Sequence, residues 1–199
     1  MSEKKYSVSL MRPRIDQFLR PLLRQAGFKL DYEIAEGESV NPDFENPEVV
    51  VRFSGNDVDL LLANKAELLL ALEYLTMEAL QIPSEDHSRL SFDAQDYRAL
   101  RIEELRLSAV AAADKVKRTG VPFKFNPMNS RERRVIHLAL RNESEVRSES
   151  TGHGGFRQVV IYPAGMASLP EAPPPAYQHA ARPQGRGGGR PRAQSRGRS

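Results

Sequence analysis

The sequence predicts an α+β fold made of two small parts, followed by a tail without regular structure. Helical segments with one apolar face are interleaved with short segments rich in Val and Ile, which is typical of helices packed on small sheets. The 199 residues suffice for one domain or for two small ones. From residue 164 onward Pro, Gly, Ala and Arg dominate, and such a composition cannot bury enough apolar surface to offset the entropy of ordering.

The first part is expected to begin with an amphipathic helix over residues 12–26. Pro13 suits the first turn of this helix and Gly27 suits its end, whereas Pro21 inside it is expected to kink or restart it. The remaining elements of this part are expected to be strands at residues 28–35 and 48–53, helices at residues 58–62 and 67–80, and a strand at residues 89–94.

The second part is expected to begin with a long helix over residues 97–118, which Gly120 ends. Its other elements are expected to be a strand at residues 121–125, a helix over residues 127–141, and a hairpin of residues 145–150 and 157–162.

The helix over residues 127–141 carries the most informative pair of side chains. Arg133 and His137 are four residues apart, so a helix brings them to one face about one turn apart. Asn129 is a good N-cap, and Glu132 completes a capping box. Apolar residues on the rest of the helix indicate that Arg133 and His137 face outward, where a guanidinium and an imidazole suit a phosphate oxygen or a stacked base.

The residues around this pair resemble a known family. The run at residues 127–140 (PMNSRERRVIHLAL) resembles the core of the R-3-H domain, which is named for an Arg and a His separated by three residues and binds single-stranded nucleic acid. Together with residues 146–150 (VRSES) and 157–161 (RQVVI), the run is similar to bacterial Jag-type (SpoIIIJ-associated) proteins, which pair a KH domain with an R-3-H domain. The resemblance covers roughly residues 12–163.

The resemblance implies a domain order. We expect an N-terminal extension (1–11), a type II KH-like domain of order α-β-β-α-α-β (12–96), a connecting helix (97–119), a small α/β R-3-H domain (120–163) and a disordered Arg/Gly/Pro-rich tail (164–199). Since only eleven residues precede the KH-like domain, we also expect the separate N-terminal Jag domain of the family to be missing.

The resemblance also implies a binding site. Arg133 and His137 would contact nucleic acid, and the surrounding residues that would enlarge the site are Asn129, Arg131, Arg134, Lys124, Arg147 and Arg157. The alternative is that Arg133 and His137 brace the domain and point into its sheet. Arg134 lies one position further along the helix, so it is also explained as a plain surface charge.

The KH-like segment departs from the family pattern. The family carries G-x-x-G between its two central helices, where glycines let the backbone approach the nucleic acid. Here the tetrapeptide is Ala63-Asn64-Lys65-Ala66, and each alanine adds a Cβ and resists positive φ. Lys65 retains a basic side chain. The alternative to RNA clamping by this loop is a scaffold for folding or for protein contact.

Charge is segregated along the chain. Residues 1–113 carry 13 Lys and Arg against 20 Asp and Glu, a net −7, whereas residues 114–163 carry 10 against 5, a net +5, and residues 164–199 carry 6 against 1, again +5. Attraction of a polyanion is therefore expected in the C-terminal half. The Arg/Gly-rich end would act as an electrostatic tether, or simply as a solubilising end.

Other function classes find little support. Without Cys, disulfides and thiolate chemistry are excluded, and the four His are too scattered to suggest a metal site. No motif indicates an enzyme or a cofactor. No apolar run approaches the ~20 residues of a membrane helix, and no segment of signal-peptide type follows Met1, so a cytoplasmic location is expected.

The resemblance, supported by the charge segregation, implies a bacterial RNA-binding regulator that holds single-stranded RNA without chemistry on it. Single-stranded DNA is an alternative ligand, and a second small KH protein is the partner that the family suggests. The rival class is a protein–protein adaptor, in which the KH-like part is an interaction surface and the R-3-H helix is vestigial.

Overall fold

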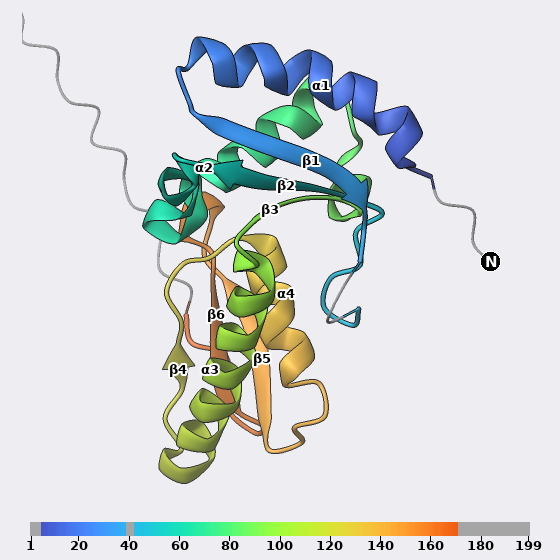
Figure 1. The fold of residues 1–199 in the computed structure, drawn as a ribbon. Helices are drawn as coiled ribbons and strands as arrows, with labels where there is room; N and C mark the ends of the chain where they lie inside the picture. The colour runs from blue at the N-terminus through green and yellow to red at the C-terminus, as the bar shows by residue number, and fades with distance from the viewer. Residues whose placement is uncertain (1–4, 39–41, 171–199) are drawn as a thin grey trace, which may run out of the picture.

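The computed structural model describes residues 5–38 and 42–170. Figure 1 shows two parts, with α1, α2 and the first sheet above and α3, α4 and the second sheet below. The mixture of helices and strands confirms the predicted α+β class. The elements of the first part are α1 (Val8–Gln25), β1 (Leu30–Glu36), β2 (Val49–Gly55), α2 (Val58–Ala79), the short 3₁₀ helix η1 (Ser84–Arg89) and β3 (Leu90–Ala94).

The first sheet has the order β1-β2-β3, with β1 antiparallel and β3 parallel to β2. The side chains on one of its faces meet the apolar faces of α1 and α2, because alternate residues of a strand point to the same side. This core includes Ile15, Leu19, Ile34, Val51 and Phe92, all of which are buried. Because α2 is broken into two helical segments, the element order is α-β-β-α-α-β, the order expected for the KH-like part.

Helix α1 begins four residues earlier than the sequence predicted. Ser7 is its N-cap, and the Ser7 side chain accepts a hydrogen bond from the Leu10 backbone N–H. The helix contains both Pro13 and Pro21 and does not restart at Pro21, contrary to the prediction. Both prolines are exposed, as are the residues four positions earlier, so water can reach the carbonyl groups that lose their helical partners.

Helix α2 is broken at Ala63-Asn64-Lys65-Ala66, the tetrapeptide at which the KH-like interpretation expected its loop, and the break leaves the two helical segments that the sequence predicted. Asn64, Lys65 and Ala66 have φ angles of 51°, 61° and 60°, so this loop adopts left-handed backbone without glycine. The expectation that alanine would resist positive φ is therefore wrong for Ala66. This residue is fully buried in the first core, and that packing offsets a backbone cost of about 1–2 kcal/mol.

The second part holds a three-stranded antiparallel sheet of order β4-β6-β5. Its elements are α3 (Tyr97–Thr119), β4 (Phe123–Lys124), α4 (Ser130–Ala139), β5 (Val146–Thr151), the 3₁₀ turn η2 (Gly154–Phe156) and β6 (Gln158–Pro163). Gly120, with a φ angle of 67°, ends α3 as predicted. A second core joins α3 and α4 to the sheet through Leu105, Val116, Ile136 and Val159.

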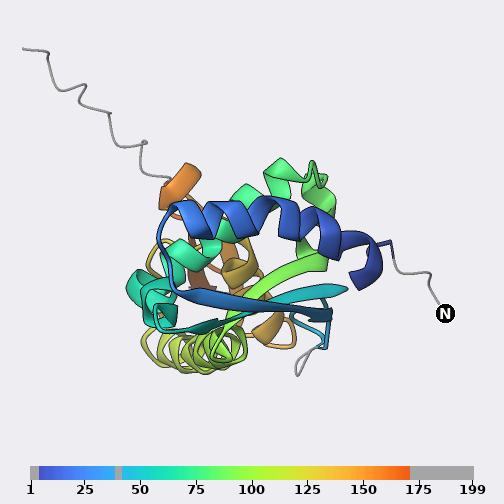
Figure 2. The same cartoon turned by 45° about the horizontal axis from the view of Figure 1, so that its top comes forward.

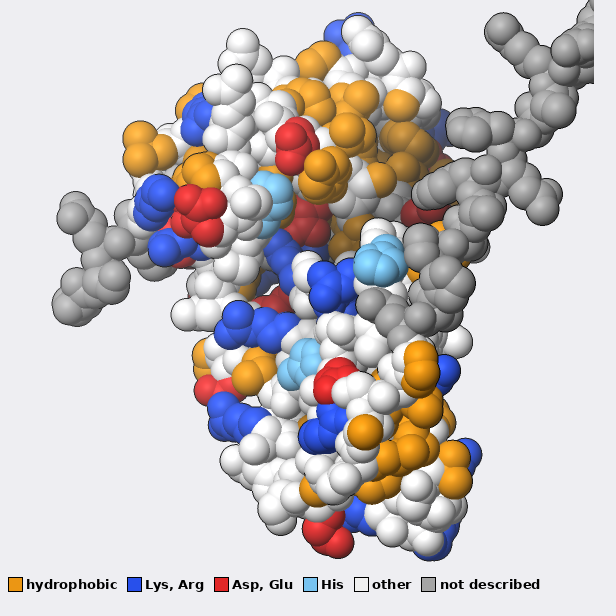
Figure 3. Space-filling view, turned by 180° about the vertical axis from the view of Figure 1, so that it is seen from behind, with side chains coloured by type: hydrophobic (Ala, Val, Ile, Leu, Met, Phe, Trp, Pro, Cys, Tyr) orange, Lys and Arg blue, Asp and Glu red, His pale blue; other side chains and the backbone are white. Residues whose placement is uncertain are grey.

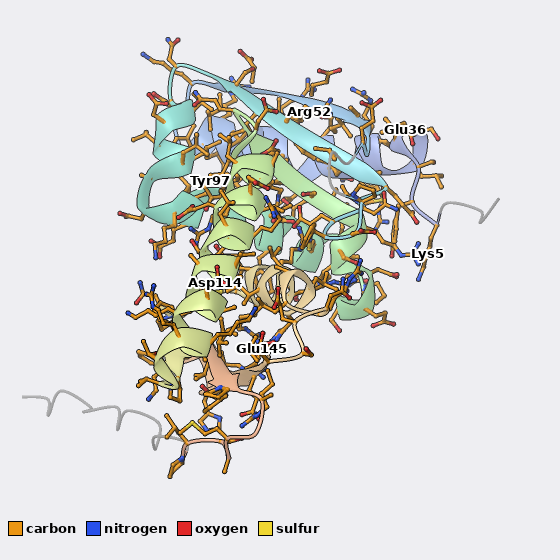
Figure 4. The ribbon with its side chains drawn as sticks, turned by 90° about the horizontal axis from the view of Figure 1, so that it is seen from below. Lys5, Glu36, Arg52, Tyr97, Asp114 and Glu145 are labelled. Atoms are coloured by element: carbon orange, nitrogen blue, oxygen red, sulfur yellow. The ribbon has the colours of Figure 1, made fainter. Side chains whose placement is uncertain are left out.

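Helix α3 connects the two parts. In Figure 2, α1 and α3 lie on opposite sides of the first sheet. Figure 4 shows α3 running from Tyr97, next to the first sheet, to Asp114, beside α4 and the second sheet. The beginning of α3 thus covers the outer face of the first sheet, and the rest of the helix packs in the second core.

Four charged side chains bind α4 to the first part. Glu73 of α2 is 5% exposed and pairs with Arg98 of α3 and, at 2.9 Å, with Arg131 of α4. Arg98 also pairs with Glu45 at 3.1 Å, in the connection between β1 and β2. Burial raises the pKa of Glu73, while Arg98 and Arg131 beside it pull this pKa down. The first turn of α4 is therefore held in place by a buried ionic cluster of Glu45, Glu73, Arg98 and Arg131.

Residues 164–170 lie against the second sheet, whereas the sequence predicted disorder from residue 164. The Ala164 N–H donates to the Glu145 carbonyl at 2.9 Å, and the Leu169 N–H donates to the Tyr162 hydroxyl at 3.3 Å. The Arg/Gly-rich segment falls outside the described residues. Among the described residues, no helix is long and apolar enough to cross a membrane.

Candidate nucleic-acid interface

The start of α4 has the capping box that the sequence predicted. The Asn129 side chain accepts from the Glu132 N–H at 2.9 Å, and the Glu132 carboxylate accepts from the Asn129 N–H at 3.1 Å. Arg101 of α3 donates to the same Glu132 carboxylate at 2.6 Å. Asn129 is a candidate contact residue, but its side-chain oxygen is occupied by capping α4.

Arg133 and His137 lie together on one face of α4, as their spacing predicted, and this face lies against β5. Arg133 donates through Nη1 to the Ser150 hydroxyl at 2.9 Å. The two ring nitrogens of His137 lie 2.7 Å from the Ser148 hydroxyl and 3.0 Å from the Ser150 hydroxyl. Both side chains are half-buried, so the expectation that they face outward is only partly met.

The environment of the pair favours a neutral imidazole. Burial lowers the pKa of His137 below its usual value, and the positive charge of Arg133 lowers it further. The two serine hydroxyls can each donate or accept, so they satisfy either tautomer of the neutral ring. A neutral His137 can stack on a base while its ring nitrogens stay bonded to the two serines.

One nitrogen of the Arg133 guanidinium makes no hydrogen bond within the described part of the chain. This nitrogen, Nε, is buried. Burial lowers the pKa of Arg133, and the nearby charge of Arg157 lowers it as well. Arg157 has extended backbone two residues before Val159, which pairs with Ser150 and faces the second core, so alternation places Arg157 on the same side of the sheet. Two guanidinium groups that repel each other would both gain from an anion between them.

The structure divides the predicted site residues between two faces of the second sheet. Val146 is in the core and Ser148 contacts His137, so alternation places Arg147 on the opposite face. Lys124 pairs in register with Val160, between the core residues Val159 and Ile161, and therefore also lies on that opposite face. Neither basic residue shares the face of Arg133 and His137.

Arg147 is occupied by contacts within the chain. Its guanidinium lies 4.4 Å from the centre of the Tyr162 ring, pairs with Glu149, and donates to the Met166 carbonyl at 2.7 Å. This side chain therefore holds residues 164–170 against the sheet. Arg131 is likewise occupied, because it pairs with Glu73 and donates to the carbonyl of Leu90 at 3.0 Å.

Arg134 and Arg157 are exposed, and together with Arg133 and His137 they are the predicted basic residues that remain available on the α4–β5 side. Ser148 and Ser150 complete this group, although the sequence did not single them out. The signal for them was present, since the alternation of residues 146–150 places both serines on the face that Val146 shares. The residues that could hold a ligand here are Arg133, Arg134, His137, Ser148, Ser150 and Arg157, which we call the α4–β5 face.

Among the described residues, no group of three or more acidic or His side chains could hold a metal ion.

The lowered pKa of His137 predicts a pH-dependent stability. The fold favours the neutral ring, so its contribution is complete above the ordinary His pKa of about 6.5 and is lost as the pH falls through the lower pKa of the folded state. Replacing His137 by Gln should therefore reduce the loss of stability between pH 7.5 and pH 5. Urea unfolding of both proteins at the two pH values measures this, and an equal loss in both would contradict it.

Comparison with known proteins agrees with the geometry of the second part. The R-3-H domain family matches residues 103–163. The chain is 32% identical over 145 residues to RNA-binding protein KhpB of Clostridium symbiosum, which covers 73% of this chain and 63% of that protein.

Two further bacterial relatives carry the same name. The chain is 34% identical over 110 residues to RNA-binding protein KhpB of Bacillus subtilis, covering 54% of this chain and 53% of that protein. It is 27% identical over 144 residues to the protein of that name from Lactiplantibacillus plantarum, covering 72% and 42%. The chain thus spans about half the length of the curated relatives that it matches.

Proposed function

We propose that this chain, which carries an R-3-H domain at residues 103–163 and is related to bacterial proteins named for RNA binding, holds single-stranded RNA on the α4–β5 face. Arg133 would bind a phosphate or the edge of a base, and His137 would stack on a base, because both of its ring nitrogens already contact serine hydroxyls. We also propose a cytoplasmic location and binding without chemistry on the RNA, since the relatives are named for binding.

The observation that carries this proposal is the geometry of Arg133. A half-buried guanidinium that donates to a serine, keeps a buried Nε unpaired and lies near a second arginine is incompletely satisfied by the chain itself. The buried Nε is closed to a ligand, so an anionic ligand would bind the part of the half-buried guanidinium that stays exposed. An RNA phosphate supplies acceptors that a guanidinium binds in pairs.

Charge on the surface supports the same location. Figure 3 shows one side of the molecule on which Lys, Arg and His side chains gather across the middle and lower parts. The net charge of +5 over residues 114–163 contrasts with the −7 of residues 1–113. An RNA strand is therefore attracted to the second part more strongly than to the first.

The KH-like loop supports a smaller role for the first part. Ala66 is fully buried, so neither its backbone nor its methyl group is open to a ligand. Lys65 is exposed, but its carbonyl oxygen accepts from the Tyr97 hydroxyl at 2.9 Å. We propose that this loop is mainly a scaffold, with Asn64 and Lys65 adding at most a weak contact.

Two arginines on opposite faces of the second sheet test the proposal. Replacing Arg157 by alanine should weaken binding of a 12-nucleotide single-stranded RNA about tenfold or more, the range of one charged hydrogen bond. Replacing Arg147 by alanine removes the same charge from the other face and should change affinity by no more than about twofold. Fluorescence anisotropy at one fixed salt concentration measures both, with single-stranded DNA of the same sequence as a second ligand.

The two variants must be compared with their unfolding curves, because Arg147 also holds residues 164–170. Equal losses of affinity in both variants would show that RNA affinity depends on the total positive charge of the protein and not on the residues of the α4–β5 face. Tighter binding of DNA than of RNA would replace RNA as the proposed ligand, and no binding of either would favour a protein–protein adaptor.

A further inference from the structure

A shallow groove lies where the first part meets the beginning of α4. Its volume is about 190 Å³, and the residues that matter for its chemistry are Leu70, Tyr74, Met77, His87, Asn129 and Ser130. The first three come from α2, His87 comes from η1, and the last two open α4. Nothing in the proposed function assigns this groove a role.

Two aromatic rings form its wall. Tyr74 is 57% exposed although it stands on a helix that packs in the first core. Its ring centre lies 6.4 Å from that of His87, with the planes at 79°, an edge-to-face arrangement. The His87 Nε2 lies 3.0 Å from the Ile82 carbonyl, and since a carbonyl only accepts, Nε2 carries the hydrogen. This bond fixes the orientation of the ring.

The floor of the groove is apolar and its charges are already compensated. Leu70 is half-buried and gives apolar surface to the groove, whereas Met77 is 2% exposed and adds almost none. The carboxylate of Glu73, which also lines the groove, pairs with Arg98 and Arg131. A flat apolar site with aromatic walls and a polar edge suits a planar heterocycle better than a phosphate.

We propose that this groove receives one unpaired base of the single-stranded RNA, stacked on Tyr74. The inference rests on the proposed function, because it takes the strand on the α4–β5 face as given. Ser130 at the edge of the groove is three and four residues from Arg133 and Arg134, so the groove adjoins that face across one helical turn. The α4–β5 face binds the backbone, and the groove adds a base contact between the two parts of the chain.

Replacing Tyr74 by alanine should weaken binding of a 12-nucleotide single-stranded RNA about 5- to 150-fold, the range that base–aromatic stacking gives. Replacing Tyr74 by phenylalanine keeps the ring and should leave affinity within about twofold of the wild type. Leu75→Ala is the matched control, since Leu75 is the next residue of α2, is 49% exposed and does not line the groove. Anisotropy of labelled RNA measures all three.

The readouts separate this inference from the proposed function. If the wild type binds RNA and Arg157→Ala weakens it while Tyr74→Ala binds as the wild type does, the groove is not a base site but the α4–β5 face stands. If Leu75→Ala loses as much affinity as Tyr74→Ala, the effect comes from α2 as a whole and the groove assignment is wrong. If the wild type binds no RNA, both the proposed RNA binding on the α4–β5 face and the base site in the groove are wrong.

Discussion

Replacing Glu73 with alanine is expected to lower the free energy of unfolding by about 3–5 kcal/mol, the cost of removing one partner from a buried ion pair. Glu73 is the shared carboxylate of Arg98 and Arg131, which belong to α3 and α4. Without it, Glu45 at 3.1 Å is the carboxylate that still forms a salt bridge with Arg98 within the described part of the chain, and the Arg98 side chain is 13% exposed. The positive charge of Arg98 would then lack most of its neighbouring negative charge, and because the side chain stays buried, water could not hydrate it fully.

Urea unfolding of the wild type and of Glu73→Ala measures this difference. Glu78→Ala is the matched control, because Glu78 lies on the same helix and is exposed, and its loss should stay within about 0.5 kcal/mol. A loss below about 1 kcal/mol for Glu73→Ala would show that water already reaches the ionic cluster and that the two parts are not held together by it.

The ionic cluster also explains how the binding helix is positioned. Arg131 and Glu132 occupy the first turn of α4, and their side chains bond to Glu73 of α2 and to Arg101 of α3. Helix α4 is therefore anchored at its beginning by two elements that precede it in the chain. This anchoring sets the direction in which Arg133 and His137 project, one turn further along.

Much of the fold could be predicted from periodicity and end signals. Asn129 with Glu132, and Gly120, marked helix ends that the structure confirms, because capping depends on local backbone chemistry. The start of α1 was missed by four residues because Pro13 is also compatible with a first turn, whereas Ser7 provides the actual cap.

The site was harder to predict because a sequence gives the charge of a residue but not its partners. Arg131 and Arg147 were counted as binding residues, yet the structure pairs them with Glu73 and Glu149. Glu73 lies 58 positions before Arg131 in the numbering, so no local pattern could reveal that pair. For Arg147, strand alternation was a usable signal, since Val146 marks the inner face of β5.

The double variant Arg133→Ala/His137→Ala is expected to bind single-stranded RNA about 30- to 1000-fold more weakly than the wild type. Charged hydrogen bonds contribute about 1.5–3 kcal/mol each, and a lost stacking contact adds to that. The effect should exceed that of Arg157→Ala, because the double variant removes two side chains of the α4–β5 face, one of them a half-buried guanidinium near a second arginine. Arg133→Lys should recover only part of the affinity, since lysine keeps the charge but not the planar fork.

The control for this variant is Arg118→Ala. Arg118 is an exposed arginine in the last turn of α3, so the change removes a positive charge from the same part of the chain without touching α4 or β5. Its affinity for RNA should fall by no more than about threefold. Urea unfolding of each variant at the temperature of the binding assay establishes that α4 is still folded when RNA is added.

The dissociation constant of the folded Arg133→Ala/His137→Ala protein for a 12-nucleotide single-stranded RNA, measured beside the wild type at one salt concentration, tests the proposed site most directly. A dissociation constant at least about 30-fold higher than that of the wild type, with Arg118→Ala nearly unchanged, is the expected result. Equal dissociation constants for the folded double variant and the wild type would contradict the assignment of RNA binding to the α4–β5 face.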